Sequence, residues 1–163
     1  MKTVSKIMKA VVTLEKYFIG AALALATVVI MIAVVGRRLG NAPVWSEEVV
    51  RYLMIWITFV GSGICFRRNS HYGIDVIRRV PGELFQKFVT LFIILVNAVF
   101  AFCLLHYGIR FVSFVMMTGQ KTAALFWPIW IVYISVPIGG GLILIHLLEN
   151  VLGEVLRIYN IEE

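Results

Sequence analysis

Apolar and polar positions follow each other along this chain in long blocks rather than in short alternation. Four apolar blocks, at about 17–35, 44–66, 84–110 and 125–148, are separated by polar segments. A helix of about 20 apolar residues crosses the roughly 30 Å hydrocarbon core of a bilayer. Each block therefore predicts one membrane-spanning helix, and residues 1–163 form a single four-helix membrane domain.

The composition agrees with this prediction. Hydrophobic residues make up 61% of the chain and charged residues 15%, whereas soluble proteins average about 45–50% and 25%. We therefore predict an all-α integral membrane protein without a soluble catalytic domain. The net charge of +6 does not indicate nucleic-acid binding, because the lysines and arginines are divided among the loops instead of forming one basic face.

The positions of the positive charges predict the orientation, since Lys and Arg near the ends of spans favour the cytoplasmic side. If the chain starts in the cytoplasm, ten of them lie inside and four outside. The inner set is Lys2, Lys6, Lys9, Lys16, Arg67, Arg68, Arg78, Arg79, Lys87 and Arg157. The outer set is Arg37, Arg38, Arg110 and Lys121. We therefore expect both termini to be cytoplasmic.

Two stretches depart from a regular span. The polar segment 67–82 carries Ile74, Ile77 and Val80 at helical spacing, which suits a short interfacial helix lying on the membrane surface. A solvated loop fits the same composition. In the fourth block, Pro137 predicts a kink near the middle of the span.

The second block opens with an unusual cluster, Trp45-Ser46-Glu47-Glu48-Val49-Val50-Arg51-Tyr52. A charge on an isolated spanning helix costs roughly 2.5–3.5 kcal/mol at the bilayer centre and less near its surface, so these three charges need compensation. Arg51 follows Glu47 by four residues and Glu48 by three, a spacing at which one Arg bridges both carboxylates. Arg37 or Arg38 can neutralise the remaining charge from across the connection. The cluster is an internal ion network, a contact site for a membrane partner, or a proton or cation relay.

Two smaller expectations come from the same region. Ser46 is placed as the N-cap of the second helix, and Trp45 belongs at the level of the lipid headgroups.

The sequence contains no catalytic, cofactor-binding or metal-ligating pattern, and Cys65 and Cys103 are too far apart for a C-x-x-C site. His106 and His146 suggest bis-His haem ligation. The helix rise, however, places these two imidazoles near opposite membrane faces, about 20 Å or more apart. We therefore expect no enzyme activity, no cofactor and no metal.

The cluster and its surroundings resemble a known family, the small membrane (DctQ-like) subunit of tripartite ATP-independent periplasmic (TRAP) transporters. The Trp-Ser-Glu-Glu-x-x-Arg-Tyr core is the specific part of the resemblance. The matching positions are Arg37 or Arg38, Pro43, Trp45, Ser46, Glu47, Glu48, Arg51, Tyr52, Leu53, Trp56, Phe59, Gly61, Arg67, Arg68, His71, Asp75, Pro81, Pro128, Tyr133, Pro137 and Gly139.

The resemblance implies a multi-pass subunit of the bacterial inner membrane that takes part in sodium-coupled uptake of organic acids. In that family a periplasmic solute-binding protein delivers a carboxylate-bearing solute to a membrane complex, whose large multi-span subunit carries the sodium and solute sites. The implied role of the small subunit, surrounded by membrane lipid, is to support the large subunit and to dock the binding protein. By analogy, the subunit interface would include Trp45, Glu47, Glu48, Arg51 and Trp56.

Two other functions remain open at this point. One is a haem- or quinone-associated membrane anchor subunit of a respiratory enzyme, and the other is a small exporter that acts alone. A haem spectrum would favour the anchor, and solute flux from liposomes that contain this chain alone would favour the exporter.

Overall fold

The computed structural model describes residues 2–41, 43–77 and 83–159. The helices in these ranges are α1 (Lys2–Arg38), α2 (Val44–Ile77), α3 (Glu83–Thr118), α4 (Trp130–Tyr133) and α5 (Ser135–Tyr159). The described ranges contain no strand, only an isolated bridge between Lys121 and Pro128. Four segments are long and apolar enough to cross a membrane: Met8–Arg38, Val44–Phe66, Leu91–Thr118 and Trp130–Glu149. The predicted all-α membrane fold is confirmed.

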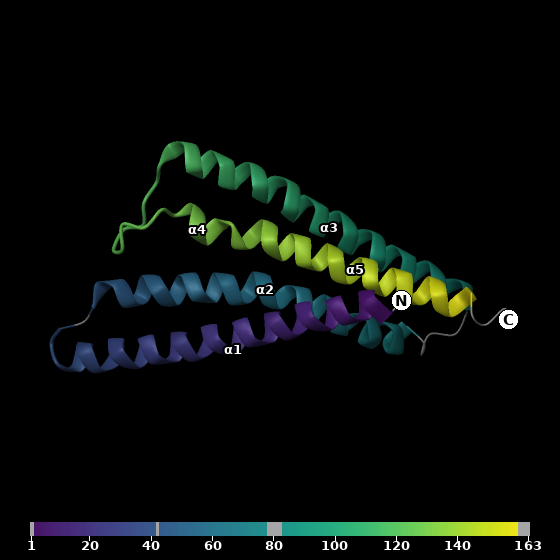
Figure 1. Ribbon diagram of the computed structural model, residues 1–163, viewed down its shortest axis with the longest axis horizontal. Helices are drawn as coiled ribbons and strands as arrows, with labels where there is room; N and C mark the ends of the chain where they lie inside the picture. Colours follow the sequence, from purple (N-terminus) through teal and green to yellow (C-terminus); the bar gives the residue numbers. More distant parts are fainter. Residues whose placement is uncertain (1, 42, 78–82, 160–163) are drawn as a thin grey trace.

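The long helices lie side by side in the order α1, α2, α5, α3 (Figure 1). The start of α1 and the last turns of α5 lie at one end of this array, which we call the terminal end. The α1–α2 connection and the loop 119–129 lie at the opposite end, which we call the loop end. Placing the start of α1 and the end of α5 at one end agrees with an even number of crossings. That this end faces the cytoplasm stays a prediction.

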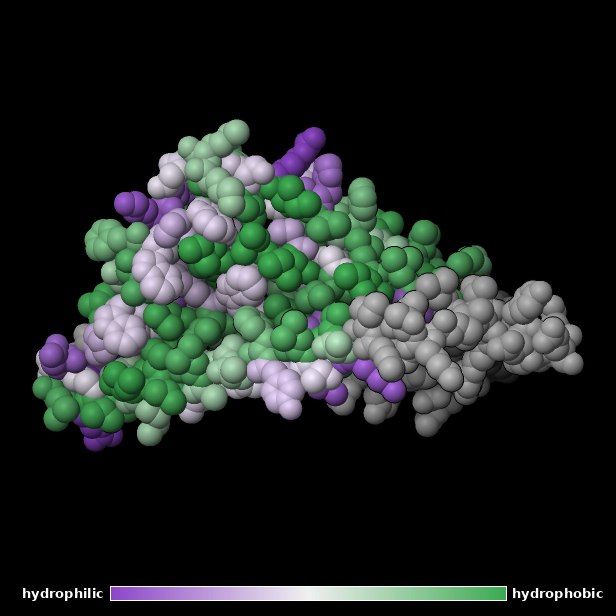
Figure 2. All heavy atoms as spheres, in the orientation of Figure 1, coloured by the Kyte–Doolittle hydropathy of each residue, from purple (hydrophilic) through white to green (hydrophobic). Residues whose placement is uncertain are grey.

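Helix α5 lies between α2 and α3 and belongs to the most buried of the four spans. In the segment that joins α4 and α5, 33% of the apolar window is buried inside the protein, against 17% for α1 and 11% for both α2 and α3. Figure 2 shows the described part of one face as a largely apolar surface with hydrophilic residues mainly at its edges. Most of the helix surface is therefore left to contact lipid or another membrane protein.

Two adjacent glycines allow α5 to approach both of its neighbours closely. A Cβ on Gly139 would lie 2.7 Å from the backbone oxygen of Phe59 on α2. A Cβ on Gly140 would lie 2.9 Å from the backbone nitrogen of Leu105 on α3. Any side chain at these positions would push the helices apart, so the pair sets the spacing of α5 from α2 and α3.

Helix α2 extends further than the predicted second span. It continues without a break to Ile77, so the segment after Phe66 prolongs α2 instead of forming a separate interfacial helix. The physical reason is that no proline stands between Pro43 and Pro81 to stop the helix. Residues 78–82, the rest of the predicted interfacial segment, lie outside the described residues.

The fourth span begins later than predicted. Residues 125–129 belong to the loop, and regular helix starts with α4 at Trp130. The helix is interrupted at Ile134, between α4 and α5. Pro137 has no N–H to donate to the carbonyl of Tyr133, so the interruption lies one turn before this proline.

Candidate functional site at the loop end

The cluster predicted from the sequence lies in the first two turns of α2, which begins directly after Pro43. Ser46 is buried inside this first turn, and its hydroxyl donates to the carbonyl oxygen of Pro43 at 2.6 Å. Because Ser46 lies within the helix and its hydroxyl acts as a donor, its predicted role as an N-cap is wrong.

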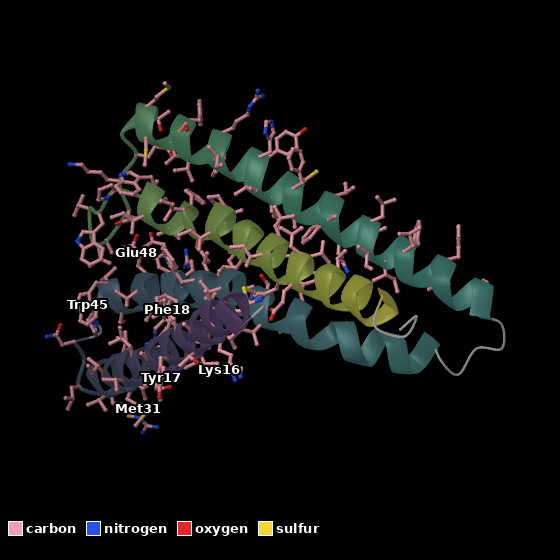
Figure 3. All side chains as sticks on the ribbon, turned by 45° about the vertical axis from the view of Figure 1, so that its right-hand side comes forward. Lys16, Tyr17, Phe18, Met31, Trp45 and Glu48 are labelled. Atoms are coloured by element: carbon pink, nitrogen blue, oxygen red, sulfur yellow. The ribbon has the colours of Figure 1, made fainter. Side chains whose placement is uncertain are left out.

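Glu48 connects α2 to the loop that precedes α4 (Figure 3). Its Oε1 accepts the backbone N–H of Ala123 at 3.0 Å, and its Oε2 accepts those of Ala124 at 2.8 Å and Leu125 at 2.9 Å. Tyr52, one turn along α2, donates its hydroxyl to Oε1. Successive amides that face one anion form a favourable concave site, and such charge-assisted bonds are strong. Glu48 is therefore satisfied within the chain and fixes the loop onto α2.

The loop also has internal hydrogen bonds of its own. The buried Thr122 donates its backbone N–H to the oxygen of Trp127 at 2.8 Å, and its hydroxyl accepts the N–H of Trp127 at 3.0 Å. Ile129 donates to the oxygen of Gln120 at 3.1 Å. Phe126 has φ 55°, which is unusual for an aromatic residue. The loop displays Phe126 and Trp127 at its tip, 71% and 58% exposed.

Glu47, next in sequence to Glu48, pairs with Arg37 at the end of α1 instead. The Arg37 Nη2 and Glu47 Oε1 atoms are 2.8 Å apart, and these side chains are 69% and 68% exposed. The predicted compensation by Arg37 is confirmed. Arg51 is exposed and makes no ion pair within the described ranges, so the predicted double bridge is wrong. In place of Arg51, Arg37 pairs with the carboxylate of Glu47, and the loop amides bind the carboxylate of Glu48.

The two predicted tryptophans lie in different surroundings. Trp45 is exposed at the loop end (Figure 3), as expected for a residue near the headgroups. Trp56 lies about 16 Å further along α2, with its ring centroid 5.8 Å from that of Phe18 on α1. The structure thus brings Trp45, Glu47, Glu48 and Arg51 to one end and places Trp56 outside this group.

The two histidines considered for haem have separate environments. His106 on α3 is exposed and stacks on Phe102, with 5.9 Å between ring centroids. His146 on α5 is buried, with Nε2 3.1 Å from Oε1 of Glu15 on α1. Over the part of the chain that the structure describes, no three or more His, Cys, Asp or Glu side chains are grouped to hold a metal. Sequence reasoning did not single out Glu15.

Residues 17–157 match the family described as "Tripartite ATP-independent periplasmic transporters, DctQ component". One relative is the sialic acid TRAP transporter permease protein SiaT of Haemophilus influenzae, 31% identical over 105 residues, or 63% of this chain and 17% of that protein. The ectoine TRAP transporter small permease protein TeaB of Halomonas elongata is 32% identical over 107 residues, 65% of this chain and 55% of the relative. The C4-dicarboxylate TRAP transporter small permease protein DctQ of Rhodobacter capsulatus is 26% identical over 110 residues, which are 68% of this chain and 48% of that protein. The chain thus spans about half the length of the two small permeases and 17% of the length of SiaT.

Proposed function

Since this multi-pass membrane protein belongs to the DctQ component family of tripartite ATP-independent periplasmic transporters, we propose that it is the small permease subunit of such a system. It supports a large multi-span transport subunit in the bacterial inner membrane and helps to dock a periplasmic solute-binding protein. Its relatives are transporter permeases and not enzymes, so a respiratory anchor has no support among them.

The Glu48 carboxylate is the observation that carries this proposal. It fixes the loop 119–129 in one conformation through three backbone amides. A fixed loop presents a constant surface to a second protein without losing conformational entropy on binding. The exposed aromatic side chains of Phe126 and Trp127 at the tip are of the kind that protein interfaces favour.

The cluster residues then divide into two roles. Glu47 and Glu48 are engaged within the chain, by Arg37 and by the loop amides. Trp45 and Arg51 are exposed at the same end, and we assign them to the contact with the large subunit. Trp56 acts indirectly, through the packing of α2 against α1.

The groove between α3 and α5 favours a supporting role over a solute pathway. A groove of about 640 Å³ between α3 and α5 is lined almost entirely by apolar side chains, with Arg110 as the charged residue. Such a lining suits a lipid chain or an apolar partner side chain better than a polar solute. We therefore place the solute and sodium sites in the large subunit. The names of the relatives mention sialic acid, ectoine and C4-dicarboxylate as solutes. For this chain we propose a carboxylate-bearing organic acid as the solute of the complex.

The test is recovery of the complex from native membrane in mild detergent, with the small chain tagged and its bound proteins identified by mass spectrometry. A large polytopic subunit should be recovered with the wild type. Trp45→Ala combined with Arg51→Ala should lower its yield by roughly fivefold, as expected for an interface residue of moderate weight. Lys16→Ala is the control, because Lys16 is exposed near the terminal end.

Two outcomes would contradict the proposal. Recovery of soluble redox subunits with a haem spectrum would establish the respiratory anchor instead. An unchanged yield in the double variant would remove Trp45 and Arg51 from the interface.

A further inference from the structure

One acid and one base are enclosed in the helical array, away from the loop end. Glu15 on α1 is 4% exposed and His146 on α5 is 0% exposed. The Nε2 atom of His146 lies 3.1 Å from Oε1 and 3.2 Å from Oε2 of Glu15. At these distances an Nε2–H group of the imidazole can donate to the carboxylate oxygens. Ionisable groups inside a membrane segment are costly, and they persist where they pair and serve a purpose.

Gly63 on α2 provides the space in which this pair forms. A Cβ at Gly63 would lie 3.1 Å from Cβ of Leu142, and 3.4 Å from both Oε1 of Glu15 and Cδ2 of His146. A larger side chain would fill the place where the carboxylate passes α2. Glu15 thus connects α1 to α5, although the backbones of these two helices do not pack against each other.

Helix α1 has few other restraints. Among the described helices it packs against α2 alone, at one edge of the array (Figure 1). Its ion pair at the loop end, between Arg37 and Glu47, is exposed, and exposed pairs contribute little. Arg37 lies about 33 Å from Glu15 along the helix. The Glu15–His146 pair is a direct polar connection between α1 and α5.

A second carboxylate lies on the other side of the His146 ring. Its Nδ1 lies 3.8 Å from Oε2 of Glu149, one turn further along α5, which is beyond hydrogen-bond distance. Carboxylates therefore stand on both sides of the imidazole, one from α1 and one from α5. The α2 side contributes Gly63, which adds no charge.

We propose that Glu15 and His146 are positioning residues that hold α1 against α5 and fix how α1 crosses α2 at the terminal end. This role belongs to the chain itself and does not depend on the proposed transport function. Without the pair, α1 can pivot on α2, because its remaining contacts lie on this one neighbour and the ion pair among them, Arg37–Glu47, is exposed.

The experiment measures the distance between α1 and α5 in the full chain in lipid nanodiscs. Spin labels are placed at Leu14 and Leu148, which are exposed, after Cys65 and Cys103 are replaced by serine. Glu15→Leu should give a longer and broader distance distribution than the parent chain. Glu15→Gln should retain the parent distribution, because its amide oxygen still accepts the Nε2–H bond.

Two controls separate positioning from general loss of structure. Labels at Met54 on α2 and Leu148 on α5 report an interface that does not use the pair, so their distribution should not change. The second control is Lys16→Leu. Lys16 is the exposed neighbour of Glu15, and its side chain points away from α5 (Figure 3), so this change should leave the α1–α5 distance distribution as in the parent chain.

If Glu15→Leu is not recovered in folded form, Glu15→Ser gives the same test, since its side chain is too short to reach the imidazole. An α1–α5 distribution that stays unchanged in either variant would overturn the proposal. So would equal broadening of both label pairs, which would mean that the pair supports the fold as a whole.

Discussion

Two glutamates connect the α1–α2 side of the array to the α3–α5 side, one at each end. At the loop end, Glu48 accepts backbone N–H groups of a loop and remains partly accessible. At the terminal end, Glu15 is enclosed and meets the side chain of His146. Glu48 determines the conformation of a surface loop, whereas Glu15 determines the position of a helix. Similar chemistry therefore gives a shaped surface at one end and a fixed frame at the other.

The largest effect is expected at the terminal end. His146→Leu leaves the carboxylate of Glu15 buried without its partner, which should lower the free energy of unfolding by about 3–5 kcal/mol. Replacing both residues, Glu15→Leu with His146→Leu, should recover most of this loss, because a buried pair exchanged for apolar side chains is often neutral. SDS titration in mixed micelles measures both values. An equal loss in the single and double variants would contradict the pairing.

The next effect is expected in the loop. Glu48→Ala removes the common acceptor of the amides of Ala123, Ala124 and Leu125. Their hydrogen exchange should accelerate by about tenfold to a hundredfold, as expected when a hydrogen bond to a charged group is lost. Mass spectrometry of the peptide around these residues follows the change. Glu47→Ala is the matched control and should leave this exchange as in the wild type.

A smaller change should follow from Tyr52→Phe, which removes the hydroxyl that donates to Glu48. The carboxylate keeps its three amides but loses one support for its orientation. Exchange of the same amides should rise by about threefold, less than for Glu48→Ala. A change as large as that of Glu48→Ala would mean that the hydroxyl, and not the amides, determines the position of the carboxylate.

The smallest effect is expected for the exposed pair. Arg37→Gln should lower the free energy of unfolding by no more than about 0.5 kcal/mol at physiological salt, and added salt should remove the difference. The same SDS titration at two salt concentrations measures this. A loss comparable to that of His146→Leu would show that both ends hold α1 equally.

The four spans were predictable because apolar blocks of membrane length leave little choice of structure. The loop before α4 was not, since the carboxylate of Glu48 binds main-chain amides, which every residue except proline carries and which leave no sequence pattern. Helical spacing predicted an Arg51 bridge, but spacing reports only which residues share a face and not which partner is nearest. Arg37, from another helix, is nearer to Glu47.

The buried pair was missed for a different reason. Glu15 lies beside Lys16 at the start of an apolar block, where a charge normally marks the membrane surface. Its partner is 131 residues away in the chain, and the space that admits it depends on Gly63 of a third helix. The combination of a carboxylate, a histidine and a glycine on three different spans is the signal that would have identified it.

The way in which Glu48 holds its loop also affects how this region can change over evolutionary time. Because the carboxylate binds amides, the anchor itself does not depend on which side chains stand at positions 123–125, although it excludes proline, which has no N–H. The exposed tip at Phe126 and Trp127 can likewise diversify while its support stays constant. One membrane frame can in this way acquire new docking partners through changes in a few loop residues, without any repacking between its helices.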